Sequence, residues 1–188
     1  MKIKLIENGL DSLKKGFEYL KQYEEQYLLE KSGHERYFIL KDAILSIHHG
    51  IEILFKEVLR KSNELLIYSD IDKSLKNAYV EKRQRKLDSL FETSQTLHTV
   101  TFREAIDRVQ RICGHEINQH FSNKLHKIED YRNQITHSEV ALDEIEINET
   151  FDGLIDEVDI FFMKSIGTEY STLTGYAQLK EKYNVSVK

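Results

Sequence analysis

Residues 3–27 read IKLIENGLDSLKKGFEYLKQYEEQY, and their apolar side chains recur at steps of three and four. The recurring positions are Ile3, Ile6, Leu10, Leu13, Phe17, Leu20 and Tyr27, with one missing position at Glu24. This spacing predicts an amphipathic helix of about seven turns with a single buried face. Ser32 and Gly33 follow it, and we expect the helix to end there because glycine readily adopts the left-handed conformation of a helix C-terminus.

The next segment, residues 35–61, has the same helical period. Its inner face comprises Leu40, Ile44, Ile47, Ile51, Leu54, Phe55 and Val58. Two long amphipathic helices joined by a short connection pack as an antiparallel hairpin. The sequence therefore predicts a long antiparallel helical hairpin as the base of the fold.

The rest of the chain is predicted to add shorter helices. We expect a turn at 69–72, a polar helix over 77–91 and a loop over 94–99. Thr101 and Glu104 have the spacing of a capping box, which predicts a helix from there to about 112, ending near Gly114. Further helices are expected over 123–140 and 148–165, and no alternating strand pattern occurs. The prediction is an all-α, compact bundle of about five to six helices in a single domain, 1–188, with its core in about 1–165 and a peripheral tail over 166–188.

Composition narrows the class of protein. The 188 residues include 27 basic and 32 acidic side chains, for a net charge of −5, and 40% are hydrophobic. That length suits one domain, and no apolar run approaches the roughly 20 residues of a membrane-spanning helix. No contact with a membrane is therefore expected. A single cysteine, Cys113, cannot form an internal disulfide, so we expect a cytoplasmic protein. Residues 73–132 carry 12 basic and 8 acidic groups, which allows contact with a polyanion.

Histidine pairs elsewhere are weak candidates for chemistry. The segment His115–His120 resembles the zinc motif H-E-x-x-H, but the additional residue places the two imidazoles about 140° apart on a helix. We therefore expect no metal and no cofactor. His48 and His49 point about 100° apart, so one is expected near the core and the other beside solvent. Glu52 is expected to pair with a lysine or arginine.

The strongest signal is the segment 130–137, DYRNQITH. If Ile135 marks the apolar side of its helix, Asn133 and His137 lie on the outward side, about 40° from each other. Arg132 lies at the border. His126 and Asp130 share the outward face with Asn133 and His137. Most polar faces of this kind are simply solvated, and that alternative stays open.

Arg132-Asn133-Gln134-Ile135-Thr136-His137 resembles the R-N-x-x-x-H form of the R-x(4–6)-H motif of the HEPN superfamily (higher eukaryotes and prokaryotes nucleotide-binding domain). The long hairpin, the segment 51–56 and the spacing from 101–106 to the motif add to the likeness, which covers about residues 1–165. The resemblance implies a homodimeric, metal-independent endoribonuclease of the kind found among prokaryotic toxins and antiviral effectors. It assigns Arg132 and His137 as the catalytic pair and Asn133 as the polar neighbour that orients them. Some family toxins have a modified tyrosine two residues after the histidine, where this chain has Glu139.

These residue types suit RNA cleavage by the 2′-hydroxyl. Histidine transfers protons near neutral pH, and arginine offers a planar, permanently charged fork to phosphate oxygens. One histidine fills only one proton-transfer role, which favours a two-fold site that uses His137 from both chains. His126 and Asp130, on the same face, are expected to contribute to substrate binding. Phosphate contacts are expected from the basic residues Lys82, Arg83, Arg85, Lys86, Arg103, Arg108 and Arg111.

Two other functions remain open from the sequence. The same face of a HEPN-type fold could bind RNA, a nucleotide or a protein without cleaving it. A purely structural helical protein would have no RNA affinity and no salt-dependent binding. The expected partners are an RNA substrate, a second copy of the chain, and a cognate antitoxin or defence-system partner.

Overall fold

The computed structural model describes residues 3–28, 33–137, 141–173 and 175. Most of these residues form helices, and their one β feature is an isolated bridge between Tyr68 and Thr99. The all-α prediction is confirmed. None of the described helices combines the length and apolar character required to cross a membrane.

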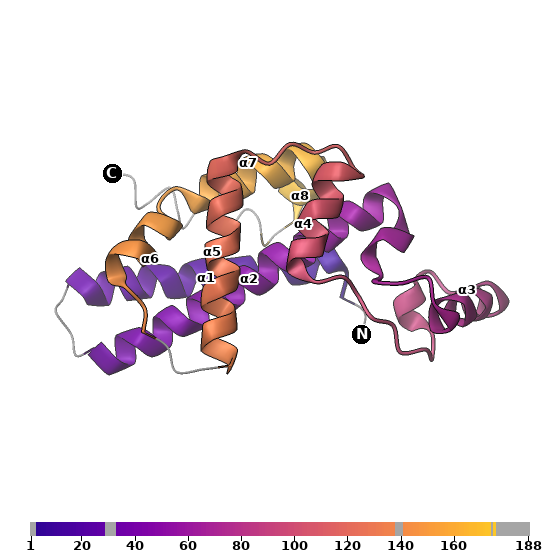
Figure 1. Cartoon of the computed structure of the whole chain (residues 1–188), viewed down its shortest axis with the longest axis horizontal. Helices are drawn as coiled ribbons and strands as arrows, with labels where there is room; N and C mark the ends of the chain where they lie inside the picture. The colour runs from indigo at the N-terminus through magenta and orange to yellow at the C-terminus, as the bar shows by residue number, and fades with distance from the viewer. Residues whose placement is uncertain (1–2, 29–32, 138–140, 174, 176–188) are drawn as a thin grey trace.

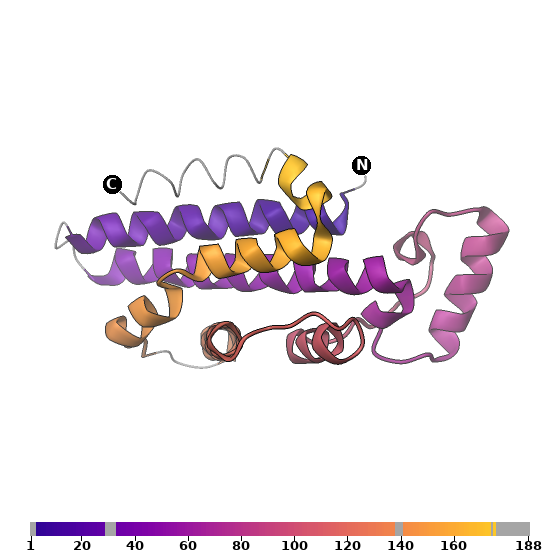
Figure 2. The same ribbon diagram turned by 90° about the horizontal axis from the view of Figure 1, so that it is seen from above.

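The two longest helices, α1 (Leu5–Leu28) and α2 (Gly33–Ser62), lie side by side along the molecule (Figures 1 and 2). They run antiparallel, because Gly9 faces Gly50 and Leu54 while Gly16 faces Ala43 and Ile47. The backbones approach so closely that a Cβ atom added to Gly16 would lie 2.7 Å from the Ile47 amide nitrogen. Glycine is required at these positions by space, since a larger residue would push the helices apart.

The buried face of α1 follows the predicted spacing, with Ile6, Leu10, Leu13, Phe17 and Leu20 at most 4% exposed. Tyr23 is also buried. Ile3 precedes the helix and is 59% exposed, so its predicted place in the core is wrong. The Tyr27 side chain and Ser32 lie outside what the structure describes.

Gly33 differs from its predicted role. It is the first residue of α2 and does not have a positive φ, so it opens the second helix instead of ending the first.

Beyond α2, the chain forms an arm that extends past the end of the α1–α2 pair (Figure 2). Its elements are η1 (Glu64–Ile67), α3 (Lys73–Arg85) and η2 (Leu90–Glu92). The helix predicted over 77–91 begins earlier because the Asp72 side chain caps the Leu75 amide at 2.8 Å. It ends earlier because Lys86 adopts a left-handed conformation with φ of 53°.

The two ends of the arm are held together at its base. The Ser69 amide donates to the His98 carbonyl at 3.0 Å, and the Val100 amide donates to the Ile67 carbonyl at 2.8 Å. Arg108 adds hydrogen bonds to the carbonyls of Leu66 and Tyr68 at 2.9 and 2.8 Å. The chain therefore leaves and re-enters the bundle at adjacent points.

Helix α4 (Phe102–Arg111) begins as predicted, with the Thr101 hydroxyl accepting from the Glu104 amide. The reciprocal half of the capping box does not form, since the Glu104 carboxylate accepts from Arg108 at 2.6 Å instead.

Helix α5 (Gln119–His137) starts four residues before its predicted beginning. The reason is that Asn118 caps the Phe121 amide at 2.8 Å. Its predicted end at residue 140 falls outside the described residues.

The single helix predicted over 148–165 is two helices, α6 (Glu144–Phe151) and α7 (Leu154–Ile166). Gly153 breaks it with a φ of 62°, a conformation that glycine adopts without strain. Asp143 caps α6 by accepting from the amides of Ile145 and Glu146.

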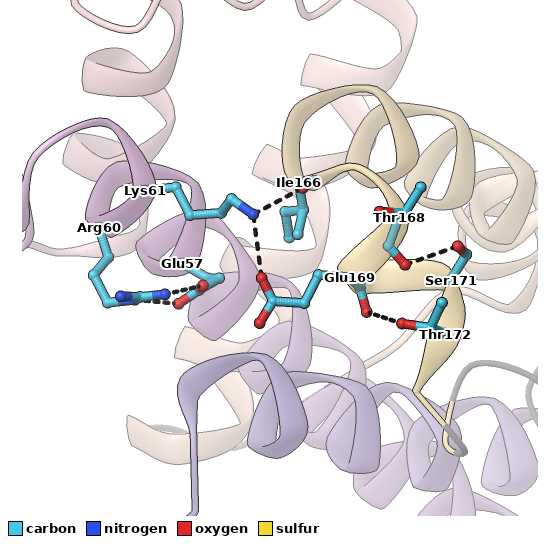
Figure 3. A network of polar contacts seen from close by, with 8 residues as sticks. All are labelled: Glu57, Arg60, Lys61, Ile166, Thr168, Glu169, Ser171 and Thr172. Carbon is cyan, nitrogen blue, oxygen red and sulfur yellow. Dashed lines mark hydrogen bonds and ion pairs between the residues drawn. The ribbon is translucent and has the colours of Figure 1, made fainter.

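A short helix, α8 (Thr168–Thr172), closes the described part of the chain against the end of α2. Lys61 donates to the Ile166 carbonyl at 3.0 Å and to Glu169 at 3.2 Å, as Figure 3 shows. Glu57 is 1% exposed and pairs with Arg60 beside this contact. Most of the predicted peripheral tail lies beyond the described residues.

Candidate functional site

Helix α5 crosses the α1–α2 pair steeply and places the candidate motif at its C-terminal end (Figure 1). Phe121, Leu125 and Ile128 are at most 2% exposed and anchor its inner side in the core. Arg132 continues this stripe one turn later and is half-buried, while Ile135 is only partly covered. The inner side of α5 is therefore fully buried around Ile128 and becomes partly exposed toward Ile135.

The motif residues form a polar group on the last turns of α5. The Arg132 guanidinium donates through Nη1 to the Asn133 amide oxygen at 2.9 Å. The Thr136 hydroxyl donates to the carbonyls of Arg132 and Asn133 at 2.9 and 3.2 Å, so it is turned back against its own helix. His137 is exposed and is the last residue of the helix. His137 is five residues beyond Arg132, so the two side chains point about 140° apart on the helix. An arginine oriented by an amide can bind a phosphate, and an exposed imidazole can transfer a proton.

His126 and Asp130 lie on the same helix, facing α4. His126 lines a cavity of about 370 Å³ between α4 and α5, which Arg103 also lines. Its Nδ1 atom is buried without a hydrogen-bond partner among the described residues. Arg103 forms ion pairs with the carboxylates of Glu129 and Asp130, the latter at 2.8 Å. The two candidate residues Arg103 and Asp130 therefore neutralise each other's charge.

The remaining basic candidates fall into two groups. Some are engaged by neighbouring acids: Arg108 with Glu104, Arg111 with Asp107, Lys82 with Glu64, and Arg85 with Glu81. Arg83 and Lys86 are exposed, and so are two lysines of α3 that sequence reasoning missed, Lys73 and Lys76. These four have no ion-pair partner within the described part of the chain. They lie on the projecting arm and not beside the motif.

The other histidines lie as expected. His48 is 5% exposed and His49 is exposed, so one packs in the core and the other borders solvent. Glu52 pairs with Lys56 at 2.7 Å, as predicted. His115 lies before α5 and contacts the Phe161 ring, while His120 is in the first turn of α5, so the two do not share a helix face.

Sequence reasoning gave His48 no functional role. Its ring is packed against Phe102, with the ring centroids 4.6 Å apart. Burial lowers its pKa to about 4, and the positive charge of Arg132 acts in the same direction, whereas Glu52 opposes it. The signal that could have found it is the four-residue spacing of His48, Glu52 and Lys56 along one helix.

The described residues contain no cluster of three or more histidine, cysteine, aspartate or glutamate side chains suited to hold a metal ion. Comparisons of the chain with protein-family models, with curated proteins and with solved structures found no match.

Proposed function

We propose that this chain is a metal-independent endoribonuclease of the HEPN type that acts as a homodimer. The observation that carries the proposal is the group formed by Arg132, Asn133 and His137 at the end of α5. There the arginine is held by the asparagine at 2.9 Å, and the imidazole at the end of the helix is exposed. The resemblance of the motif and the all-α fold support it.

In the proposed reaction, a base removes the proton from a ribose 2′-hydroxyl and the 2′-oxygen attacks the adjacent phosphorus. The bond to the 5′-oxygen breaks, and an acid protonates the leaving oxygen. His137 supplies one of these proton transfers and the partner's copy of the same residue supplies the other. Arg132 stabilises the charge that builds on the phosphate oxygens. The products are a 2′,3′-cyclic phosphate and a free 5′-hydroxyl.

The deciding experiment compares wild type with His137→Ala and Arg132→Ala on total RNA in EDTA, with the fragment ends mapped. We expect wild type to leave 2′,3′-cyclic phosphates and each variant to lose at least about 100-fold in rate, with an unchanged circular dichroism spectrum. Equal cleavage by wild type and the His137 variant would exclude this site. Binding of RNA by all three without cleavage would instead support a non-catalytic binding module.

The biological role that fits this activity is a cytoplasmic toxin or antiviral defence effector, restrained by a cognate antitoxin or a defence-system partner. Glu139, where some family toxins have a modified tyrosine, lies outside the described residues. Induced expression in bacteria should arrest growth with wild type and not with His137→Ala. Growth arrest by both proteins would separate the toxicity from the proposed chemistry.

A further inference from the structure

Helices α4 and α5 lie beside each other on one side of the α1–α2 pair (Figures 1 and 2). The cavity of about 370 Å³ between them is lined by Arg103, Glu104, Asp107 and Gln110 of α4 and by His126 of α5, among others. Its volume is at the lower end of the range for small-molecule sites. The cavity therefore suits one flat ring system and is too small for a duplex.

The α4 side of the cavity is rich in hydrogen-bond acceptors. Arg108 binds Oε1 of Glu104 at 2.6 Å, and Arg111 binds Oδ1 of Asp107 at 2.7 Å. Each carboxylate thus keeps its second oxygen for a further donor. The amide nitrogen of Gln110 donates to a backbone carbonyl of the chain at 3.4 Å, which leaves the amide oxygen as a third acceptor. A ligand of this cavity is expected to present donors.

Two flat side chains line the same cavity, one from each helix. The Arg103 guanidinium is held at its edge by Glu129 and Asp130, and the side chain is 58% exposed. A guanidinium bound at its edge still offers its face, on which a nucleobase can stack. His126 buries its Nδ1 atom without a hydrogen-bond partner among the described residues, while the ring lines the cavity. Imidazole rings are also stacking surfaces for bases.

The cavity lies on the face of α5 that carries part of the proposed site. His126 precedes Asn133 by seven residues and His137 by eleven, so on a regular helix the three side chains point within about 40° of one another. The helical rise places His126 about 10 Å from Asn133 and about 16 Å from His137 along the axis. A single RNA strand that follows this face therefore meets both the cavity and the motif.

We propose that the cavity between α4 and α5 binds one unstacked RNA base that carries an exocyclic amino group. The amino group donates to the acceptors of Glu104, Asp107 and Gln110, and the ring stacks on the flat side chains of Arg103 and His126. Uracil is disfavoured because it presents a carbonyl oxygen where cytosine presents an amino group. The inference rests on the proposed function for its ligand, RNA, but the preference among bases can be tested without cleavage.

The first test measures the binding of ten-nucleotide RNAs, made only of cytidine or only of uridine, to His137→Ala protein, which is expected to leave the RNA intact. We expect the cytidine strand to bind at least about 5-fold more tightly, because the two bases differ in the group at position 4. The ratio of the two affinities is the readout, since a change in protein charge alters both equally. Equal affinities would overturn the proposal.

Asp107→Asn, added to His137→Ala, tests the carboxylate itself. Arg111 requires an oxygen at Oδ1, so the amide of the variant turns its NH₂ group to the position of the second oxygen. A donor there repels the amino group and favours uracil, so the ratio should fall to unity or below. Asp156→Asn is the matched control, because it removes the same charge from an exposed position on α7 and should leave the ratio unchanged.

Gln110→Met is a second variant, because it removes an acceptor of the cavity and leaves the ion pairs of α4 intact. It should also lower the ratio, with an unchanged circular dichroism spectrum. A ratio that stays at its starting value in both variants would place the preference outside this cavity and overturn the proposal.

The outcomes separate this inference from the proposed function. If RNA is cleaved in a manner that depends on His137 but the cytidine and uridine strands bind equally, the base site is wrong and the ribonuclease stands. If wild type does not cleave RNA while the cytidine preference is present and disappears in Asp107→Asn, the ribonuclease is wrong and the base site stands.

Discussion

At the scale of single residues, the buried imidazole of His48 makes the stability of the fold depend on pH. Burial lowers its pKa in the folded chain to about 4, against about 6.5 in an unfolded chain. Above pH 6.5 both states are neutral at this residue. Between pH 6.5 and 4 the unfolded chain takes up a proton that the folded chain does not, so stability falls as the pH falls.

We expect this effect to remove on the order of 3 kcal/mol from the free energy of unfolding between pH 7 and 4. His48→Gln should lose that share of the pH dependence, and urea unfolding at a series of pH values measures it. His49→Gln is the control and should keep the wild-type slope, since His49 is exposed. The same slope in wild type and His48→Gln would contradict the assignment.

At the scale of elements, the contact between α1 and α2 depends on three glycines. A Cβ added to Gly50 would lie 2.7 Å from the Leu13 amide nitrogen and 2.9 Å from the Gly9 carbonyl oxygen. Because backbone atoms cannot rotate away, the helices would have to separate. Gly16→Ala and Gly50→Ala should each lower the free energy of unfolding by about 1–3 kcal/mol, although alanine is the better helix former.

Gly33→Ala provides the matched control for these two variants. The nearest atom to an added Cβ there is a carbon of the Tyr37 ring at 3.5 Å, an ordinary contact. We expect its midpoint in urea to stay at or above that of wild type. A midpoint for Gly16→Ala as high as that of Gly33→Ala would show that the helices do not pack as closely as described.

Helix α3 carries the exposed positive charge of the arm. Lys73, Lys76 and Arg83 are exposed and unpaired among the described residues, and they lie on one side of the helix at steps of three and seven. If RNA extends over the arm, changing all three to glutamine should weaken its binding. The slope of log K against log salt should fall by up to about 0.7 for each phosphate that the variant no longer neutralises.

This binding is best measured with His137→Ala protein, so that the RNA stays intact. The control changes three lysines of α1 and its N-terminal flank, Lys4, Lys15 and Lys21, to glutamine and so alters the net charge equally. A loss of affinity as large in the control as in the α3 variant would mean that overall charge, and not the arm, holds the RNA.

An element could be predicted from the sequence where the residues that determine its buried face and its ends lie within one segment. The faces of α1 and α2 followed from apolar spacing alone, because each helix buries a stripe of its own residues. The break between α6 and α7 was missed because Phe151, Leu154 and Val158 keep a helical period across it. Asp152 and Gly153 form a turn signal that should have counted for more.

The same distinction, between features set by one segment and features set by packing, applies to the candidate site. Arg132, Asn133 and His137 could be predicted as candidates because they form one motif on one helix, where spacing determines the direction of each side chain. The burial of His48 against Phe102 was indicated only by its spacing with Glu52 and Lys56, since the contact itself depends on how α4 packs on α2. The close approaches at Gly9, Gly16 and Gly50 likewise exist only once the two helices have packed.

At the scale of the whole molecule, the proposed chemistry requires two chains. If one site uses His137 from both copies, a mixed dimer of wild type and His137→Ala has a site with a single histidine. Adding excess His137→Ala to dilute wild type should therefore suppress cleavage almost completely once subunits exchange. An unrelated acidic protein at the same concentration is the control, and an undiminished rate would show that each chain acts alone.

The hydrogen bonds that join the two ends of the arm at its base have a consequence for the evolution of the protein. Because Ser69 and His98 are joined by a hydrogen bond, the residues between them form a long loop whose two ends lie next to each other. A loop of this kind can be lengthened, shortened or exchanged with little entropic penalty to the rest of the chain. Helix α5, which carries Arg132 and His137, lies outside this loop. Changes to the arm can therefore leave the proposed site at the end of α5 unaltered.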